Sequence, residues 1–272
     1  MTGYVLYEYT PNLPCAVLFA ALFALSTALH LYQRIRHHSK YFNPFIVGGI
    51  FQVIGYGARC VSHFSPTAVM PYSLQSLFIL LAPILYAASI YMVLGRIITF
   101  VDAPHLSVVP VHRMTKTFVG GDIFSFILQA AGGGIMSSGK EKALQIGQYV
   151  IIAGLGVQLL FFGSFLLASF YFHSRIVKTP TEKAERTKDL RASIWPRDWR
   201  GLLFACYAVS LLILVRSVYR LVEFSQGSSG YVISHEVFLY VFDAAMMFCV
   251  MLIMNLFHPS VVLSQVEDAE KN

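Results

Sequence analysis

Seven long runs of apolar residues, separated by short polar segments, divide the chain from end to end. The runs cover residues 14–33, 44–63, 71–100, 118–138, 147–172, 202–223 and 235–257. A helix needs roughly 20 apolar residues to cross the hydrocarbon layer of a bilayer, and each run reaches that length. The pattern therefore predicts an all-α fold, with one membrane domain over residues 1–272 built as a bundle of seven transmembrane helices.

The third run differs from the others because it is about 30 residues long and contains Pro83. Proline in a helix interior removes one backbone hydrogen bond and crowds the preceding turn. A helix longer than the bilayer is thick must also tilt or project from it. We therefore expect this helix to be tilted, kinked or extended beyond the membrane.

The polar segments between the runs alternate in their content of Lys and Arg. The first 13 residues and the segments after the second and sixth runs have none, whereas the other segments are basic. Eight of the chain's 20 Lys and Arg lie between Arg175 and Arg200. Because basic residues accumulate in cytoplasmic loops, we expect the N-terminus outside, the 173–200 loop in the cytoplasm, and a polar cytoplasmic tail over residues 260–272.

Two smaller expectations follow from this topology. Trp195 and Trp199 stand beside basic residues at the start of the sixth run, which is typical of an anchor at the membrane interface. Cys15 and Cys60 both fall near the non-cytoplasmic face, so the sequence leaves a disulfide between them open.

The composition supports membrane residence and argues against a nucleic-acid-binding protein. The chain is 56% hydrophobic and 12% charged, with a mean hydropathy of +0.63, whereas soluble domains carry about 25% charged residues. The net charge is +6, but its basic residues flank apolar runs instead of forming one phosphate-binding face. We therefore expect membrane lipids as partners of the chain, and no nucleic acid; no protein partner is identified.

Charged residues inside the last two runs form the main candidate site. Each run carries three polar residues spaced i, i+4, i+7, a spacing that lines one face of a helix. These residues are Arg216, Arg220, Glu223, Glu236, Tyr240 and Asp243. A hairpin through residues 226–230 places Arg216 level with Asp243, and Arg220 level with Glu236. Arg59 of the second run falls in the same outer half of the membrane and is expected to form a third wall.

Two interpretations of this cluster stay open at this point. An ionisable residue at the centre of a membrane helix costs about 2.5–3.5 kcal/mol on insertion scales, so such residues need a reason to be there. In the first, ion pairs hold the second, sixth and seventh helices together. In the second, the charged residues line a water-filled, outward-facing cavity that recognises a charged headgroup. Three arginines face three carboxylates, so a cationic ligand has to compete with internal partners.

The fourth run carries a second polar group that ends in a run of glycines. Its members are Asp122, Ser125, Gln129, Gly132, Gly133 and Gly134. The glycines favour either tight helix packing or local unwinding beside a ligand. Asp122 and Arg96 both fall toward the inner face, where an ion pair between them is open. Tyr86 and Tyr91 of the third run are candidates for lining a cavity or for aromatic packing.

Motifs of soluble enzymes are absent from the sequence. There is no GxxxxGK[ST], no GxSxG and no HExxH, and the nine His are scattered in loops and at segment ends. A zinc hydrolase needs several His at ligand spacing. We therefore predict no metal site, no cofactor and no enzymatic activity.

Seven sequence motifs, read together, resemble those of one known family. They are YEYTPNLP, QVIGYGAR, LAPILYAASIYMVLGRII, DIFSFILQAAGGGI, GLGVQLLFF, RSVYRLVEFSQGSSGYVISHEVFLYVFD and FHP. In this order they are similar to the fungal RTA-like proteins, the "resistance to aminocholesterol" or lipid-translocating exporter family. The resemblance covers residues 4 to about 259 and includes motifs from every helix except the first.

This resemblance implies a seven-helix protein of fungal membranes, usually of the plasma membrane. Members are linked to the translocation of sphingoid long-chain bases and to resistance against toxic amphiphiles, and some to porphyrin or haem handling. The charged positions of the family motifs fall on Arg59, Asp122, Arg216, Arg220, Glu223, Glu236 and Asp243. The motifs do not identify the substrate of a given member or its mechanism.

The leading functional prediction is a translocator or exporter of amphipathic lipids or toxic amphiphiles, so an amphipathic small molecule is the expected binding partner. The amine of a sphingoid base would lie against Glu223, Glu236 or Asp243, with its tail along the helices or in lipid. Asp243 is the deepest of the three and the candidate for a charge-sensing or proton-titrating role. A seven-helix sensor of lipid asymmetry, contacting partners through the 173–200 loop, is the main alternative. A membrane-embedded lipid hydrolase is the third and would require bound metal.

Overall fold

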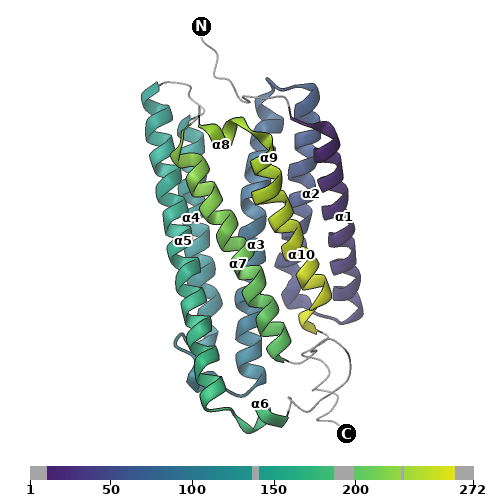
Figure 1. Ribbon diagram of the computed structural model, residues 1–272, viewed down its shortest axis with the longest axis vertical. Helices are drawn as coiled ribbons and strands as arrows, with labels where there is room; N and C mark the ends of the chain where they lie inside the picture. The colour runs from purple at the N-terminus through teal and green to yellow at the C-terminus, as the bar shows by residue number, and fades with distance from the viewer. Residues whose placement is uncertain (1–10, 137–140, 187–198, 228–229, 261–272) are drawn as a thin grey trace.

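The computed structural model describes residues 11–136, 141–186, 199–227 and 230–260, and in this part of the chain the regular structure is helical, without strands (Figure 1). Seven segments are long and apolar enough to cross a membrane. They are α1 (Leu13–Arg36), α2 (Asn43–Phe64), α3 (Val69–Phe100), α4 (Val111–Met136), α5 (Glu141–Lys178), α7 (Trp199–Ser225) and a last one in three parts, α9 (Glu236–Leu239), η3 (Tyr240–Ala245) and α10 (Met246–Leu256). The predicted all-α fold with seven membrane-spanning helices is confirmed.

Short helical elements occupy the connections between the long helices. They are η1 (Lys40–Phe42), η2 (Pro104–Leu106), α6 (Glu182–Arg186) and α8 (Tyr231–Ser234). Helix α1 begins at the same end of the bundle as α8 and α9, and α10 finishes toward the opposite end, where α6 lies (Figure 1). We call these the α8 end and the α6 end.

Helix α1 shows how local sequence sets the ends of a helix. The side chain of Asn12 accepts a hydrogen bond from the backbone N–H of Cys15, and a proline occupies the first turn. Both features favour a helix start, because they satisfy or remove N–H groups that have no partner within the helix. Arg34 and Arg36 lie in the last turn, where they complement the helix dipole.

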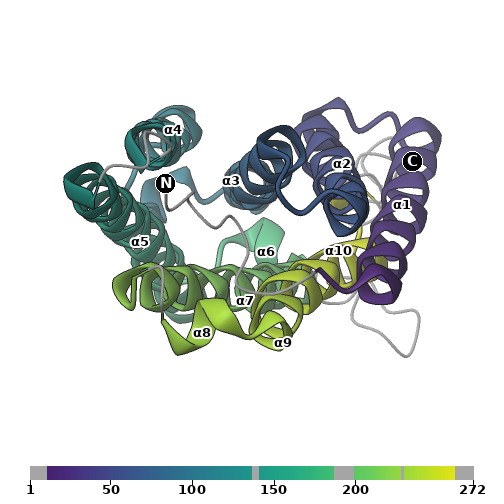
Figure 2. The same cartoon turned by 90° about the horizontal axis from the view of Figure 1, so that it is seen from above.

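The long helices form a ring in which each contacts its neighbours in sequence. The order is α1, α2, α3, α4, α5, α7 and α10, and α10 returns to pack on α1 (Figure 2). Helix α3 also contacts α7 across the ring. Helix α3 therefore has protein neighbours on several sides, and a larger fraction of its residues is buried than in any other span.

The outer surface of the bundle is apolar, as a lipid-facing surface must be. Large side chains such as Leu25, Phe64, Leu167 and Phe170 are at least 66% exposed. Exposure of such a surface over a whole protein is unfavourable in water, whereas it is compatible with the hydrocarbon of a bilayer. The chain is a multi-pass membrane protein.

Several helices are longer than the apolar runs that predict them. Helix α4 begins at Val111 instead of residue 118, and α5 covers Glu141–Lys178 instead of 147–172. The apolar run marks only the part in hydrocarbon, while the backbone continues as helix through flanking polar residues. Helix α3 has 32 residues and stays one helix through Pro83. At about 1.5 Å per residue it exceeds a hydrocarbon layer of about 30 Å, which agrees with the expected tilt or extension.

Trp199 lies inside the protein, and the question left open for Cys15 and Cys60 is answered. Trp199 is 2% exposed and its ring N–H donates to the carbonyl of Ala184 in α6, so it packs inside the protein instead of anchoring at the membrane interface. Cys15 and Cys60 are free thiols. Residues 187–198 of the 173–200 loop, which include Trp195, and residues 261–272 of the predicted tail lie outside the described residues.

Candidate functional site

The six charged residues of the main candidate site form three ion pairs. Arg59 Nη2 lies 2.6 Å from Glu236 Oε1, Arg216 Nε lies 3.1 Å from Asp243 Oδ1, and Arg220 Nη1 lies 2.7 Å from Glu223 Oε2. All six belong to the half of the bundle nearer the α8 end, on α2, α7, α9 and η3. Arg59 therefore joins the cluster as the third wall that the sequence predicted.

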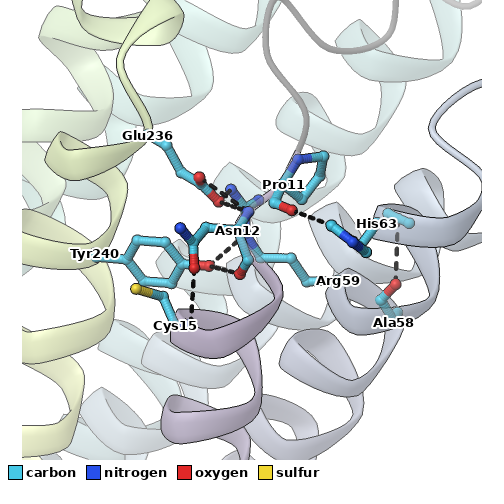
Figure 3. A network of polar contacts seen from close by, with 9 residues as sticks. Pro11, Asn12, Cys15, Ala58, Arg59, His63, Glu236 and Tyr240 are labelled. Carbon is cyan, nitrogen blue, oxygen red and sulfur yellow. Dashed lines mark hydrogen bonds and ion pairs between the residues drawn. The ribbon is translucent and has the colours of Figure 1, made fainter.

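The pair nearest the α8 end is part of a network that ties four segments together (Figure 3). Arg59 Nε donates to the hydroxyl of Tyr240 over 3.1 Å. The backbone N–H of Asn12 donates to both carboxylate oxygens of Glu236, at 2.8 and 3.0 Å. The Tyr240 hydroxyl donates to the Asn12 carbonyl at 3.3 Å. Glu236 thus holds the start of α1 and the end of α2 against α9.

The middle pair is the most deeply buried. Arg216 presents Nε and Nη2 to the two carboxylate oxygens of Asp243, at 3.1 and 3.2 Å. Its Nη2 also donates to the backbone carbonyl of Ile79 in α3 at 3.1 Å. The side chains are 1% and 0% exposed. A fork of this kind fixes both position and orientation, so Arg216 joins α7, η3 and α3.

The third pair lies within a single helix. Arg220 and Glu223 are three residues apart on α7, and the Tyr219 hydroxyl donates to Glu223 at 3.4 Å. Arg220 Nε has no hydrogen-bond partner in the described part of the chain. The guanidinium lies 5.2 Å from the ring centroid of Phe224, close enough for a cation–π contact.

The predicted alignment of Arg216 with Asp243 is correct, but that of Arg220 with Glu236 is wrong. Glu236 pairs with Arg59, and Arg220 pairs with its own helix neighbour. The prediction assumed a regular helix, whereas η3 over Tyr240–Ala245 is a π-helix. A π turn carries more residues than an α turn, so Glu236 and Asp243 face different neighbours.

Exposure separates Glu236 from the other five charged side chains. It is 15% exposed, whereas the others are 9% exposed or less. In this state the charges are paired and covered by protein. Glu236 is therefore the most accessible of the six charged side chains, whereas Asp243 is fully buried and paired with Arg216.

The polar face of α4 lies between α3 and α5, away from the ion pairs. Ser125 Oγ donates to the Gly154 carbonyl at 2.9 Å, and Gln129 Nε2 donates to Ser125 Oγ and to Gln158 Oε1. The hydroxyl of Tyr91 donates to Asp122 Oδ2 at 2.8 Å. Asp122, Ser125 and Gln129 are all at most 4% exposed. This face holds three helices together.

The glycine run supports close packing, and the alternative of local unwinding is wrong. Helix α4 continues through all three glycines to Met136. A Cβ on Gly132 would lie 2.6 Å from the Gly147 carbonyl oxygen in α5, so only glycine fits there. Gly133 and Gly134 have no such neighbour within 4 Å. One of the three glycines carries the contact.

Two further candidate contacts involve Arg96 and the tyrosines of α3. Arg96 does not pair with Asp122, because its guanidinium lies 3.9 Å from the ring centroid of Tyr41. Tyr86 is fully buried, with its ring 4.6 Å from that of Phe45. Tyr86 therefore packs as an aromatic residue, whereas Tyr91 holds Asp122.

Sequence reasoning missed the roles of Asn12 and Gln158. Asn12 followed by Leu and Pro is a helix-start signal, but nothing local connects it to Glu236, 224 residues away. Gln158 stands in an apolar run, and its polarity in a membrane helix is the signal that would have found it. Among the described residues, no group of three or more His, Cys, Asp or Glu is placed to hold a metal ion.

A group of histidines lies at the α6 end. His258, just after α10, is 2% exposed, and its ring lies 6.2 Å from those of His30 and His37 and 5.0 Å from that of Phe42. Burial, and then the nearby His37, lower the pKa of His258 to about 4. His258 is therefore neutral at physiological pH.

Comparison with known proteins gives a consistent picture. The family described as RTA1 like protein matches residues 45–266. The chain is 35% identical to Protein RTA1 of Saccharomyces cerevisiae, over 98% of this chain and 88% of that protein. It is 35% identical to Protoporphyrin uptake protein 1 of the same yeast, over 92% and 91%, and 27% identical to its Sphingoid long-chain base transporter RSB1, over 92% and 72%. No solved structure matches.

Proposed function

Because this chain belongs to the RTA1-like family, we propose that it translocates amphipathic lipids or toxic amphiphiles across the membrane in which its helices lie. A relative aligned over 92% of this chain is named a sphingoid long-chain base transporter. A sphingoid base combines a cationic amine with a long apolar chain. We propose a substrate of that class, with one cationic headgroup and one apolar tail.

The observation that carries this proposal is the set of three buried ion pairs, of which Glu236 is the most exposed member. The amine binds Glu236 first and displaces Arg59 from it. Val237 and Val241, which are 68% and 45% exposed beside Glu236, give the tail an apolar surface to follow. Asp243 is the second, deeper carboxylate, and it becomes available when Arg216 moves.

This exchange keeps a counter-charge on the carboxylate of Glu236. Removing one partner of a buried ion pair costs about 3–5 kcal/mol, because the other charge stays buried alone. An arriving ammonium offsets that cost for the carboxylate, but it adds one positive charge to the site, and Arg59 gives up this ion pair while it keeps its hydrogen bond to the Tyr240 hydroxyl. Each carboxylate thus has two competing cations, and that competition permits release as well as binding.

The test is a translocation assay with purified protein in liposomes, using a labelled sphingoid base. We expect Glu236→Gln to lower the rate at least tenfold, because the amide keeps the shape of the side chain but loses the charge that binds the amine. Asp102→Asn is the matched control. Asp102 is exposed and outside the membrane spans, so this variant should keep the wild-type rate.

Three outcomes of this assay are informative. Loss of transport in Glu236→Gln with an unchanged folded state supports the headgroup site. A wild-type rate in that variant contradicts the site, and wild-type protein that binds the labelled base without moving it contradicts translocation. The last outcome would favour a sensor of membrane lipids.

A porphyrin is the second candidate substrate, because one relative with 35% identity is named a protoporphyrin uptake protein. Its carboxylates would pair with arginines instead of displacing them. Arg59→Gln would then abolish porphyrin movement, and Glu236→Gln would spare it. For a sphingoid base, the proposed site predicts the opposite order, in which Glu236→Gln lowers transport more than Arg59→Gln does.

We propose that the α8 end faces outward, that the C-terminus is cytoplasmic and that the protein lies in a fungal plasma membrane. The basic residues Arg34 and Arg36 at the α6 end support this orientation. In a cysteine-free background, an impermeant thiol reagent added to intact cells should label Thr67→Cys and not His105→Cys. Labelling of His105→Cys alone would show that the topology is the reverse of the proposed one. Imaging of a tagged protein tests whether it lies in the plasma membrane.

Translocation of this kind needs no covalent step, and we propose that the protein is not an enzyme. Charge exchange and helix movement suffice to bind and release the headgroup. Mass spectrometry of the labelled base before and after transport tests this directly. An altered mass that depends on the protein would contradict the proposal.

A further inference from the structure

Asp122 differs from the other buried carboxylates because no Lys or Arg among the described residues forms an ion pair with it. It lies midway along α4, in a membrane span, with 1% exposure. One carboxyl oxygen, Oδ2, accepts the hydrogen bond of Tyr91. The other, Oδ1, is buried and has no hydrogen-bond partner in the described part of the chain.

The neighbours of this carboxyl are aromatic. Around the hydroxyl that it binds, the ring of Tyr91 lies 4.4 Å from that of Phe165 in α5 and 5.5 Å from that of Phe118 in α4. At Gly121, the residue before Asp122, a Cβ would meet the ring of Phe161. From α3 and α5, the described residues thus present one titratable group to Asp122, the phenol of Tyr91.

Arg96, the basic residue that the sequence offered as a partner for Asp122, is engaged elsewhere. It is exposed, and its guanidinium stacks on Tyr41 on the other side of α3. On α4 itself, the polar residues that follow Asp122 are Ser125 and Gln129, and both are neutral and bonded toward α5. Asp243 shows the contrast, since Arg216 gives it two hydrogen bonds.

A carboxylate ion without a counter-charge is strongly disfavoured in such surroundings, since the charge would lose its hydration and gain no partner. Binding one proton removes the charge. The single hydrogen bond from Tyr91 replaces only part of the hydration that the ion would lose, and the neutral acid also accepts it, with Oδ2 as the carbonyl oxygen. The proton then resides on Oδ1, the oxygen that Tyr91 leaves open.

We propose that Asp122 is a proton-binding site, and that the proton it binds and releases is coupled to the movement of the amphiphile. The coupling rests on the proposed function, whereas the proton site does not. The bound proton stabilises the packed arrangement of α3, α4 and α5. Its release leaves a charge that Tyr91 stabilises with a single hydrogen bond and that gains more from water or a cation, and therefore favours separation of these helices.

Infrared spectroscopy of the folded protein tests the proton site by itself. At neutral pH the wild type should show the carbonyl band of a protonated carboxylic acid, and Asp122→Asn should lack it. Asp102→Asn, at an exposed carboxylate, should keep the band. Tyr91→Phe should keep it at higher frequency, because the carbonyl loses the hydrogen bond that weakens its stretch. A wild-type spectrum without the band, or a band that survives in Asp122→Asn, overturns the proposal.

Liposomes with a pH difference across the membrane test the coupling. We expect the wild-type rate of sphingoid-base movement to change several-fold with that difference, and the rate in Asp122→Asn to be independent of it. An undiminished response in Asp122→Asn overturns the coupling. If wild-type protein moves no amphiphile at all, the proposed function fails, and the infrared result still decides the proton site.

Discussion

At the scale of single residues, the partner of each buried charge decides its role. The sequence identified the charged residues inside the spans, and it predicted the pairing of Arg216 with Asp243 and the approach of Arg59. It misassigned Arg220 and Glu236, because a pairing across helices depends on their relative rotation. That rotation is set by how the helices pack, and the periodicity of residues along one helix gives no information about this packing.

The first prediction concerns the middle ion pair. Arg216→Gln should destabilise the folded protein by about 3–5 kcal/mol, since Asp243 would remain buried without a counter-charge. Arg216→Met combined with Asp243→Leu should recover most of that stability, because both charges are then absent. Thermal unfolding in detergent measures the double-mutant cycle of wild type, Arg216→Met, Asp243→Leu and the double variant, with Arg216→Gln measured beside it.

The matched control for this cycle is Arg113→Gln at an exposed arginine, which should change the unfolding temperature little. The double variant should also lose transport, if Asp243 is the deeper carboxylate for the amine. Full transport by a stable double variant would assign the pair a structural role only. Equal stability of wild type and Arg216→Gln would contradict the burial argument itself.

At the scale of elements, helix positions are predictable and helix contacts are less so. Each apolar run corresponds to a span, because hydrocarbon requires every backbone group to bond within its own helix. The π segment at Tyr240–Ala245 could not be predicted, since it reflects the fit of Glu236 and Asp243 to separate partners. Which of three adjacent glycines touches α5 also depends on helix rotation.

The second prediction uses those glycines as a matched pair. Gly132→Ala should destabilise the α4–α5 contact by about 1–3 kcal/mol, because the new methyl group meets a backbone carbonyl that cannot move aside. Gly133→Ala has open space and should be neutral, or stabilising by up to about 1 kcal/mol through helix propensity. Thermal unfolding of both variants measures the difference. Equal effects would show that α4 does not approach α5 at Gly132.

At the scale of the whole molecule, the bundle joins residues that are far apart in sequence. The family resemblance seen in the sequence is confirmed by the match over residues 45–266. The closure of the ring is tertiary information, seen in the contact of Asn12 with Glu236 and that of His30 with the Met251 carbonyl. A single sequence predicts that there are seven helices, but it does not predict which helices are neighbours in the ring.

The third prediction concerns the closure at the α6 end and its pH dependence. His258 has a pKa of about 4 in the folded protein, against a reference value of 6.5. Between these pH values the unfolded chain binds more protons than the folded one, so the free energy of unfolding rises with pH. Above this window the contribution of His258 to stability is fully present. One histidine gives a slope of up to about 1.4 kcal/mol per pH unit, or at most about 3 kcal/mol over the window.

We therefore expect the unfolding temperature to fall as the pH decreases from 6.5 to 4, and His258→Phe to reduce that fall. Phenylalanine keeps a ring against Phe42 and cannot take up a proton. His30 and His37 also lie close to His258, so the loss of slope should correspond to one histidine and not to all three. His105→Phe, at an exposed histidine, is the control and should leave the slope unchanged. An identical slope in His258→Phe and wild type would mean that protonation of His258 does not oppose the closure of α1 on α10.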